Sequence, residues 1–176
     1  MKKKNPLISI IMNCHNGEKY LKHSIKSVIS QRYKNWEIIF FDNCSTDQSI
    51  SLIKSFKNKK IRIYKSKKYL TLYAARNSAV KYAKGSYIAF LDTDDIWHPS
   101  KLNLQIKYIL EKKKDFVFSN FYYLKGKKKS INKKMRSFKE GFVTQSLLDH
   151  YGLGILTVLM SKNFFKKKKF DPKYEI

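Results

Sequence analysis

An apolar segment runs directly into three carboxylates in the stretch Ser86-Tyr87-Ile88-Ala89-Phe90-Leu91-Asp92-Thr93-Asp94-Asp95. Residues 87–91 are aliphatic and aromatic, which is typical of a strand covered on both faces. Ionised carboxylates at the edge of an apolar layer repel one another and lose hydration. Such a cluster therefore usually lies beside a cation, a basic group or open solvent.

Two interpretations of these carboxylates stay open on this stretch alone. If residues 92–94 are extended, alternation places Asp92 and Asp94 on one side, where they could share a hard divalent cation. Alternatively, the segment is a solvated turn in which Asp95 caps the helix expected after Pro99. The D-x-D pattern is too short to distinguish the two.

The first ninety residues alternate between strand-like and helix-like patterns. Apolar runs predict buried strands at residues 7–12, 36–41, 61–64 and 87–91. Helices are predicted at residues 18–31, after Ser45 and at residues 72–84. Ser45 and Gln48 have the spacing of a capping box, and Gly85 is expected to end the third helix as a left-handed cap. This order predicts an α/β fold with a doubly wound, mostly parallel sheet flanked by helices.

The predicted fold brings separate polar segments to one place. In a doubly wound sheet, ligands bind at the carboxyl ends of the strands, near the point where the strand order reverses. The polar segments that follow strands there are residues 13–16, 42–43 and 92–95. We therefore expect one binding site at this edge of the sheet.

The second half of the chain carries weaker patterns. The expected elements are a helix at 100–112, a strand at 116–124, a basic loop at 125–139, a short helix at 144–150 and a strand at 155–160. Ser161 is expected to cap a last helical turn. No linker or internal repeat interrupts the chain, so we expect a single domain over residues 1–176.

The formal net charge is +25, from 38 Lys and Arg against 13 Asp and Glu. This excess suggests a polyanionic partner such as nucleic acid, anionic lipid or a phosphorylated substrate. Arginine, the preferred residue for phosphate forks and base edges, is scarce, so we expect no nucleic-acid partner. The joint richness in Lys, Ile, Asn, Phe and Tyr is also what an A/T-rich coding sequence produces. A compositional origin of the lysines therefore stays open beside peripheral contact with an anionic membrane.

The cysteines and the apolar segments indicate the cellular compartment in which the protein is expected. Cys14 and Cys44 have neither the spacing of a zinc site nor that of a disulfide framework, which favours a reducing compartment. The apolar run at residues 7–12 is too short for a signal peptide, and no segment is long enough to span a membrane. We expect a cytoplasmic protein, including the inner face of the cell membrane as a place of contact.

Several ordered segments resemble the family-2 glycosyltransferases of the GT-A fold, and the resemblance covers essentially the whole chain. The segments that carry it are PLISII (6–11), NGEKYL (16–21), SVISQ (27–31), YKNWEII (33–39), DNCSTD (42–47), ARNSA (75–79) and AKGSYIAFLDTDDIW (83–97). The resemblance implies a Rossmann-like fold for a nucleotide-diphospho-sugar transferase. Residues 1–98 would form the half that binds the donor, and residues 99–176 an incomplete half for the acceptor.

The resemblance also implies an activity. It is the transfer of a sugar, with inversion, from a nucleotide-diphosphate donor such as a UDP-sugar to a hydroxyl of a saccharide or lipid-linked saccharide. Mn²⁺ or Mg²⁺ would assist. The residues implied to bind the donor are Asn13, His15, Asn16, Asp42, Arg76 and Asp92, and those implied to hold the metal are Asp94 and Asp92.

Individual roles follow from the same resemblance. Asp42 would accept the imide N–H of a uracil ring, and a base without that donor would leave the carboxylate unpaired. Arg76 would pair with the diphosphate through its planar guanidinium. Asp92 would reach the ribose or the metal, and Asp94 would hold the metal against both phosphates. His15 is equally well explained as a packing residue.

The sequence departs from the family pattern in two places. Asn43 and Cys44 stand where the family usually has Asp and Gly, and Cys44 predicts that the loop does not need a conformation restricted to glycine. Residues 170–176 are similar to the segment that precedes the family's general base, so we expect that base beyond Ile176. Asp149 and Glu175 are substitutes by chemistry only. A protein that binds a nucleotide sugar without transferring it is therefore the alternative.

Overall fold

Four parallel strands form the centre of the molecule. The computed structural model describes residues 5–126, 128–131 and 153–173. The sheet has six strands in the order β3-β2-β1-β4-β8-β5. The parallel strands are β1 (Ile8–Cys14), β2 (Trp36–Asp42), β3 (Ile61–Lys65) and β4 (Tyr87–Phe90). The antiparallel strand β8 (Leu159–Ser161) joins β4 to β5 (Phe116–Val117). The predicted mostly parallel α/β sheet is confirmed.

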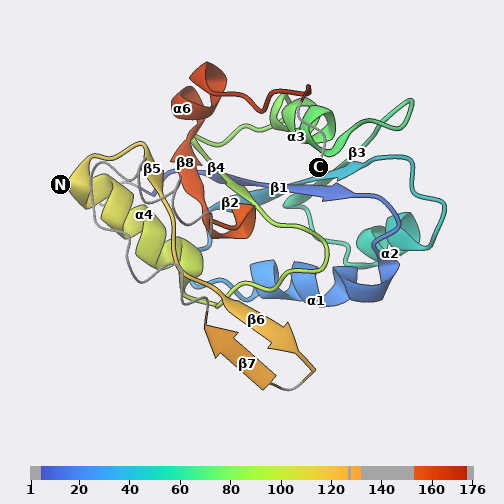
Figure 1. The fold of residues 1–176 in the computed structure, drawn as a ribbon, viewed down its shortest axis with the longest axis horizontal. Coiled ribbons are helices and arrows are strands. Elements are labelled where there is room, and N and C mark those ends of the chain that lie inside the picture. The colour runs from blue at the N-terminus through green and yellow to red at the C-terminus, as the bar shows by residue number, and fades with distance from the viewer. Residues whose placement is uncertain (1–4, 127, 132–152, 174–176) are drawn as a thin grey trace.

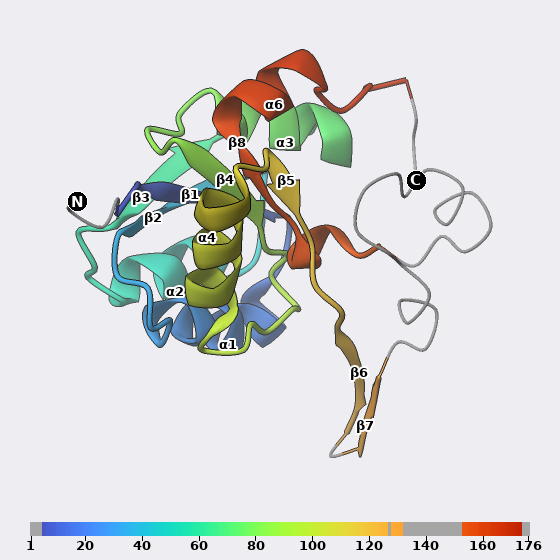
Figure 2. The same cartoon turned by 90° about the vertical axis from the view of Figure 1, so that its left-hand side faces the viewer.

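Helices cover both faces of this sheet (Figures 1 and 2). One face packs against α1 (Glu18–Ile29), α2 (Ser49–Ser55) and α4 (Lys101–Lys112), and the other against α3 (Leu72–Val80) and α6 (Lys162–Lys167). The side chains of β1 alternate between the two cores, because successive residues of a strand point to opposite faces. Ile10 belongs to the first core and Ile11 to the second.

Two small elements complete the described chain. The strands β6 (Tyr122–Lys125) and β7 (Lys128–Ile131) form an antiparallel hairpin that extends away from the helices and the sheet (Figure 2). A single 3₁₀ turn, η2 (Ile155–Thr157), leads into β8. Within the described residues, no helix combines the length and the apolar character needed to cross a membrane.

The weaker patterns of the second half were only partly interpreted correctly. The strand expected at 116–124 is two strands, β5 and β6, and the basic loop expected at 125–139 contains β7. The strand expected at 155–160 begins as η2. The Ser161 cap is confirmed, since its Oγ accepts the Phe164 N–H at 3.1 Å. The helix expected at 144–150 lies outside the described residues.

Two predicted helix boundaries are wrong. Helix α2 begins at Ser49 rather than after Ser45, and the Ser49 N–H is satisfied by Asp47 Oδ1 at 2.9 Å instead of a capping box. Helix α3 ends at Val80 and Gly85 is not left-handed. A Cβ at Gly85 would lie 2.6 Å from the Leu7 carbonyl oxygen, so the glycine is needed for the close approach of two backbones.

Candidate functional site

The candidate site lies at the carboxyl edge of the parallel strands, the edge toward which the β1 arrow points in Figure 1. In the register of the sheet, Cys14 at the end of β1 pairs with Asp42 at the end of β2, and Ile11 pairs with Phe90 at the end of β4. The three predicted polar segments therefore follow neighbouring strands at one edge.

Arg76 of α3 reaches across this edge to Asp92. Its Nη2 lies 2.9 Å from both carboxylate oxygens of Asp92. The Arg76 side chain is 6% exposed and the Asp92 side chain 35% exposed, so the acid stands at the surface and the base beneath it. The guanidinium also lies 5.8 Å from the centre of the Phe170 ring. In this structure Arg76 orients a carboxylate of the site, and the pairing with a diphosphate that the resemblance implies stays a prediction.

Residues 92–95 form a turn, so the extended D-x-D segment considered as one alternative is not present. Strand β4 ends at Phe90, and the Asp95 N–H donates to the Asp92 carbonyl at 3.2 Å. Ser24 of α1 holds the turn from below, its Oγ lying 3.0 Å from the Asp92 carbonyl oxygen and 2.7 Å from that of Asp95. The other alternative also fails in detail, since α4 has Ser100 at its N-cap without a side-chain cap.

The three carboxylates of the turn leave negative charge only partly balanced. Burial, followed by repulsion from Asp92 and Asp94, raises the pKa of Asp95 to about 6, and Arg76 opposes that shift. Asp94 is exposed. Across the described ranges, no three His, Cys, Asp or Glu side chains are grouped to hold a metal by themselves. Mg²⁺ commonly takes one or two carboxylates and completes its shell with substrate phosphates, and this turn fits that kind of site.

Asp42 is buried at the end of β2, 4% exposed. Its Oδ1 accepts the Ser45 N–H at 3.3 Å, which holds the loop that follows the strand. Asn13, at the end of β1, has a buried Nδ2 without a hydrogen-bond partner in the described part of the chain. Buried donors are rarely left unpaired, so this amide is suited to a polar ligand at the same edge.

Asn16 links the two loops of the edge. Its Oδ1 accepts the Thr46 N–H at 2.8 Å and the Asp47 N–H at 3.3 Å. Asp47 in turn accepts the Glu18 N–H at 3.0 Å. Asn16 therefore holds the site's loops together, and the donor contact that the resemblance implies stays a prediction.

His15 contacts residues that the sequence did not indicate. Its Nδ1 donates to the Asn43 carbonyl at 2.9 Å, and its ring meets the exposed Tyr69 ring edge to face at 4.8 Å. The Asn43 side chain pairs with both backbone groups of Leu70, at 2.8 and 3.0 Å. Asn43 thus fixes the segment that carries Tyr69. The only signal for Tyr69 in the sequence is an aromatic residue within a polar loop.

Cys44 adopts a positive φ of 63°, which corrects the prediction from the sequence. The loop keeps the left-handed conformation that glycine favours, with a side chain in place. Both cysteines are free, and burial raises the pKa of the Cys14 thiol. A raised pKa keeps a thiol protonated and unreactive, so Cys14 is a packing residue.

Residues after the acidic turn hold the segment before β8. Three consecutive carbonyls accept from three side chains: Leu156 from Trp97 Nε1 at 2.9 Å, Thr157 from Gln105 Nε2 at 2.6 Å and Val158 from Lys101 Nζ at 3.5 Å. The Lys101 ammonium also lies 4.2 Å from the centre of the Trp97 ring. Burial lowers the pKa of Lys101 to about 7. Together these three side chains hold the backbone of residues 156–158 in place.

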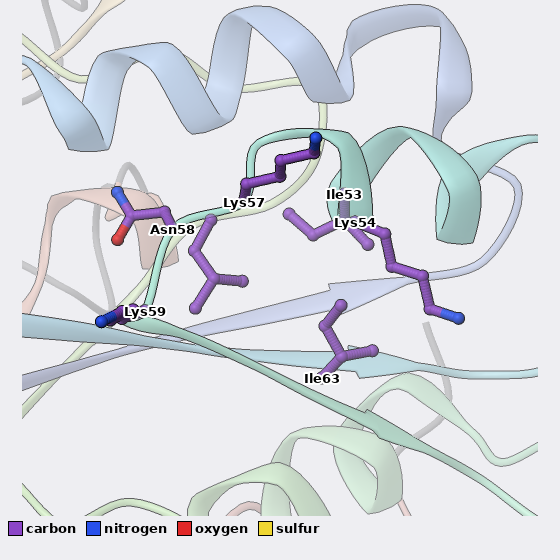
Figure 3. A pocket seen from close by; sticks show the side chains of 7 residues that line it. Ile53, Lys54, Lys57, Asn58, Lys59 and Ile63 are labelled. Carbon is purple, nitrogen blue, oxygen red and sulfur yellow. The ribbon is translucent and has the colours of Figure 1, made fainter.

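A groove elsewhere on the molecule is not part of this site (Figure 3). It has a volume of about 280 Å³ and lies between the end of α2 and the start of β3, with Lys54, Lys57 and Lys59 on its rim. Because β3 begins there, the groove lies at the amino edge of the sheet, opposite the acidic turn.

Asp149 and Glu175, considered above as bases, lie outside the described residues.

Comparisons with known proteins agree with this geometry. The model of the family "Glycosyl transferase family 2" matches residues 9–173. The chain is 34% identical over 164 residues to the Escherichia coli UDP-Glc:alpha-D-GlcNAc-diphosphoundecaprenol beta-1,3-glucosyltransferase WfgD, an alignment that covers 93% of this chain and 64% of the relative. The chain thus spans less than two thirds of that relative's length.

Solved structures share the fold. S. aureus TarS 1–349 in complex with UDP superposes with a TM-score of 0.82 at 23% identity, covering 94% of this chain and 50% of TarS 1–349. The Pyrobaculum calidifontis mannosyltransferase PcManGT, in complex with GDP-Man and Mn²⁺, gives a TM-score of 0.74 at 13% identity, covering 97% of this chain and 49% of its own. Both are glycosyltransferase folds of the type that the sequence predicts.

Proposed function

Because the chain belongs to glycosyl transferase family 2, we propose that it transfers a sugar from a nucleotide-diphosphate donor to an acceptor hydroxyl. The observation that carries this proposal is the gathering of Asp42, the Arg76–Asp92 pair and the exposed Asp94 at one edge of a parallel sheet. Ligands of doubly wound sheets bind at that edge. A neutral or apolar ligand would not need an acidic turn there.

The proposed donor is a UDP-sugar. Asp42 is a buried carboxylate at a strand end, and it can accept a hydrogen bond from the imide N–H of uracil. The orphan Nδ2 of Asn13 offers a donor to a base carbonyl, and the exposed Tyr69 ring offers a surface for stacking. The names of WfgD, with UDP-Glc, and of the TarS complex, with UDP, support the same donor class.

The proposed cofactor is Mn²⁺ or Mg²⁺, held by Asp94 and reached by Asp92. Such an ion stabilises negative charge on the departing nucleotide diphosphate. Arg76 would keep the Asp92 carboxylate in place, because a guanidinium fixed beneath it restricts its rotation. Ser24 and the Asp92–Asp95 hydrogen bond would fix the turn, so that Asp94 is presented without a large entropic cost on binding.

The proposed acceptor is a saccharide carried on a lipid, and the proposed stereochemistry is inversion. The name of WfgD gives a diphosphoundecaprenol-linked acceptor for that relative. Deprotonation of the acceptor hydroxyl needs a base within hydrogen-bond reach. Among the described residues we assign none to that role, and binding of a nucleotide sugar without transfer is the second candidate function.

Calorimetric titration with UDP and CDP tests the donor site. With Mn²⁺ present, we expect UDP to bind roughly 10- to 100-fold more tightly than CDP, because cytosine lacks the N–H that Asp42 accepts. Asp42→Asn should remove most of that preference, since an amide can offer either an acceptor or a donor. EDTA should weaken UDP binding. Equal affinities for UDP and CDP in the unaltered protein would overturn the assignment of Asp42.

An assay for UDP release distinguishes the two candidate functions. Incubation with a panel of UDP-sugars and Mn²⁺ should release UDP if the chain transfers or hydrolyses the donor. UDP binding without UDP release above the rate in buffer would favour the binding protein. The Glu111→Gln variant, altered at an exposed acid near the end of α4, is the control for the carboxylate that Asp42→Asn removes.

A further inference from the structure

The β6–β7 hairpin exposes apolar side chains that no described helix or strand covers extensively (Figure 2). Tyr122, Tyr123 and Leu124 are 62%, 56% and 55% exposed. Tyr122 and Leu124 share one face of the ribbon with Ile131 and Lys129, while Tyr123 lies on the other face with two lysines and Ser130, so each face combines apolar and cationic groups. An isolated two-stranded hairpin is marginally stable in water, so a hairpin with three exposed large apolar side chains is suited to an interaction surface.

Cations accompany these apolar residues. Lys125, Lys128 and Lys129 are exposed on the same hairpin, with Lys129 opposite Leu124 in the register. The sequence has no Asp or Glu between Asp115 and Glu140, so no acid of this segment neutralises them. Tyrosine and leucine beside lysine suit the boundary between lipid headgroups and acyl chains, where rings and stems are buried and ammonium groups meet phosphates.

The hairpin leaves the sheet on the side of the candidate site. Strand β8 is antiparallel to both β4 and β5, so β4 and β5 run in the same direction. Their carboxyl ends therefore lie at the same edge, and β6 begins five residues after β5 ends there. A surface bound by the hairpin would lie toward the edge that carries Asp42 and Asp92.

We propose that the β6–β7 hairpin docks the protein on an anionic lipid bilayer. Tyr122, Tyr123 and Leu124 enter the headgroup region, and the described lysines Lys125, Lys128 and Lys129 pair with lipid phosphates. The exposed apolar residues favour a bilayer over a soluble polyanion, which would leave them in water. The choice of a bilayer also rests on the proposed function, since a lipid-linked acceptor has to be met at a membrane surface.

Sedimentation with vesicles tests the charge component. Vesicles of phosphatidylcholine alone are compared with vesicles that also contain phosphatidylglycerol. The triple variant Lys125→Gln, Lys128→Gln, Lys129→Gln should bind the anionic vesicles more weakly, by about fivefold per lysine. The matched control is Lys54→Gln, Lys57→Gln, Lys59→Gln, which removes the same charge at the opposite edge of the sheet and should change binding by less than about twofold.

A second pair of variants tests the apolar component. Leu124 and Leu104 are similarly exposed, at 55% and 61%, but Leu104 lies on α4. Leu124→Ser should weaken binding to anionic vesicles by about tenfold, because burial of a leucine side chain is lost. Leu104→Ser should leave it unchanged. In Tyr123→Trp, the added indole should show a blue shift of its fluorescence when vesicles are present. The unaltered protein, measured in the same way, gives the contribution of its own tryptophans.

The outcomes separate this proposal from the proposed function. Equal loss in the hairpin and control lysine variants would overturn it, as would a hairpin variant that loses self-association in sedimentation velocity but keeps vesicle binding. UDP affinity is measured in every variant and should not change. Vesicle binding without any UDP binding would overturn the donor site and leave the hairpin proposal standing.

Discussion

Arg76 and Asp92 form an ion pair in which one guanidinium nitrogen, Nη2, lies 2.9 Å from both carboxylate oxygens. The pair joins α3 to the acidic turn, and the arginine is buried beneath an acid that stands at the surface. Arg76 also opposes the rise in the pKa of Asp95, so this one side chain acts on two carboxylates of the turn. The pair therefore fixes the acidic turn to helix α3.

Removal of the Arg76 guanidinium should destabilise the protein. Arg76→Met leaves the Asp92 carboxylate without its partner beside two further acids, and we expect the free energy of unfolding in urea to fall by roughly 1–3 kcal/mol. The double variant Arg76→Met, Asp92→Asn should recover part of that loss, since it removes the unpaired charge. Identical stabilities of the single and double variants would show that the pair is not coupled.

Asp94 should be needed for ligand binding and not for folding. Its exposed carboxylate supports no other part of the described structure, so Asp94→Asn should change the free energy of unfolding by less than about 0.5 kcal/mol. Affinity for UDP in the presence of Mn²⁺ should fall by roughly 10- to 100-fold. In EDTA the variant and the unaltered protein should bind UDP alike. A difference that persists in EDTA would argue against a role through the metal.

Replacement of Cys44 by glycine should stabilise the loop after β2. Its φ of 63° carries a steric cost for any residue with a Cβ, and Cys44→Gly should raise the free energy of unfolding by about 0.5–1 kcal/mol. The gain is smaller than the full steric cost because glycine adds entropy to the unfolded chain. Cys44→Ala is the control and should bring no gain, since it keeps the Cβ.

Lys101 should make the stability depend on pH. Burial lowers its pKa in the folded protein to about 7, from 10.5. Between these values the unfolded chain holds a proton that the folded protein lacks, so the free energy of unfolding should rise with pH by up to about 1.4 kcal/mol per unit. This contribution is fully present above pH 10.5 and is lost as the pH falls through about 7.

Urea unfolding at pH 7.5 and pH 9 measures the Lys101 effect. Lys101→Met should flatten the dependence, while Lys112→Met, at an exposed position of the same helix, should keep it. If the slope survives in Lys101→Met, another group is responsible for it.

Gly85 should not accept a side chain. A Cβ there would meet the Leu7 carbonyl oxygen at 2.6 Å and the Ser9 nitrogen at 2.7 Å, and backbone atoms of a central strand cannot move aside easily. Gly85→Ala should lower the melting temperature, with a loss of about 1–3 kcal/mol. Gly126→Ala is the control, because nothing lies within 4 Å of its Cβ and only its φ of 60° is unfavourable. An equal effect of the two substitutions would refute the role of close approach.

The sequence predicted those features that local patterns encode. The strands that became β1 to β4 were placed within one or two residues, because each apolar run reports burial on both faces of a sheet. Their alternation with helices gave the parallel arrangement, and with it the edge at which Asp42, Asp92 and Asp94 gather. The weak patterns after residue 112 were less informative, because short strands and a 3₁₀ turn carry too few residues to show a period.

By itself, then, the sequence determined the α/β sheet, its family and the edge that carries the polar segments. Only the tertiary structure decided which side chains meet there. Arg76 contacts Asp92, 16 residues away, and Trp97 contacts the carbonyl of Leu156, 59 residues away. Spacing along the chain contains no information on such pairs. They form because the sheet brings distant loops together, and there the acidic stretch becomes a turn held by Arg76 and Ser24.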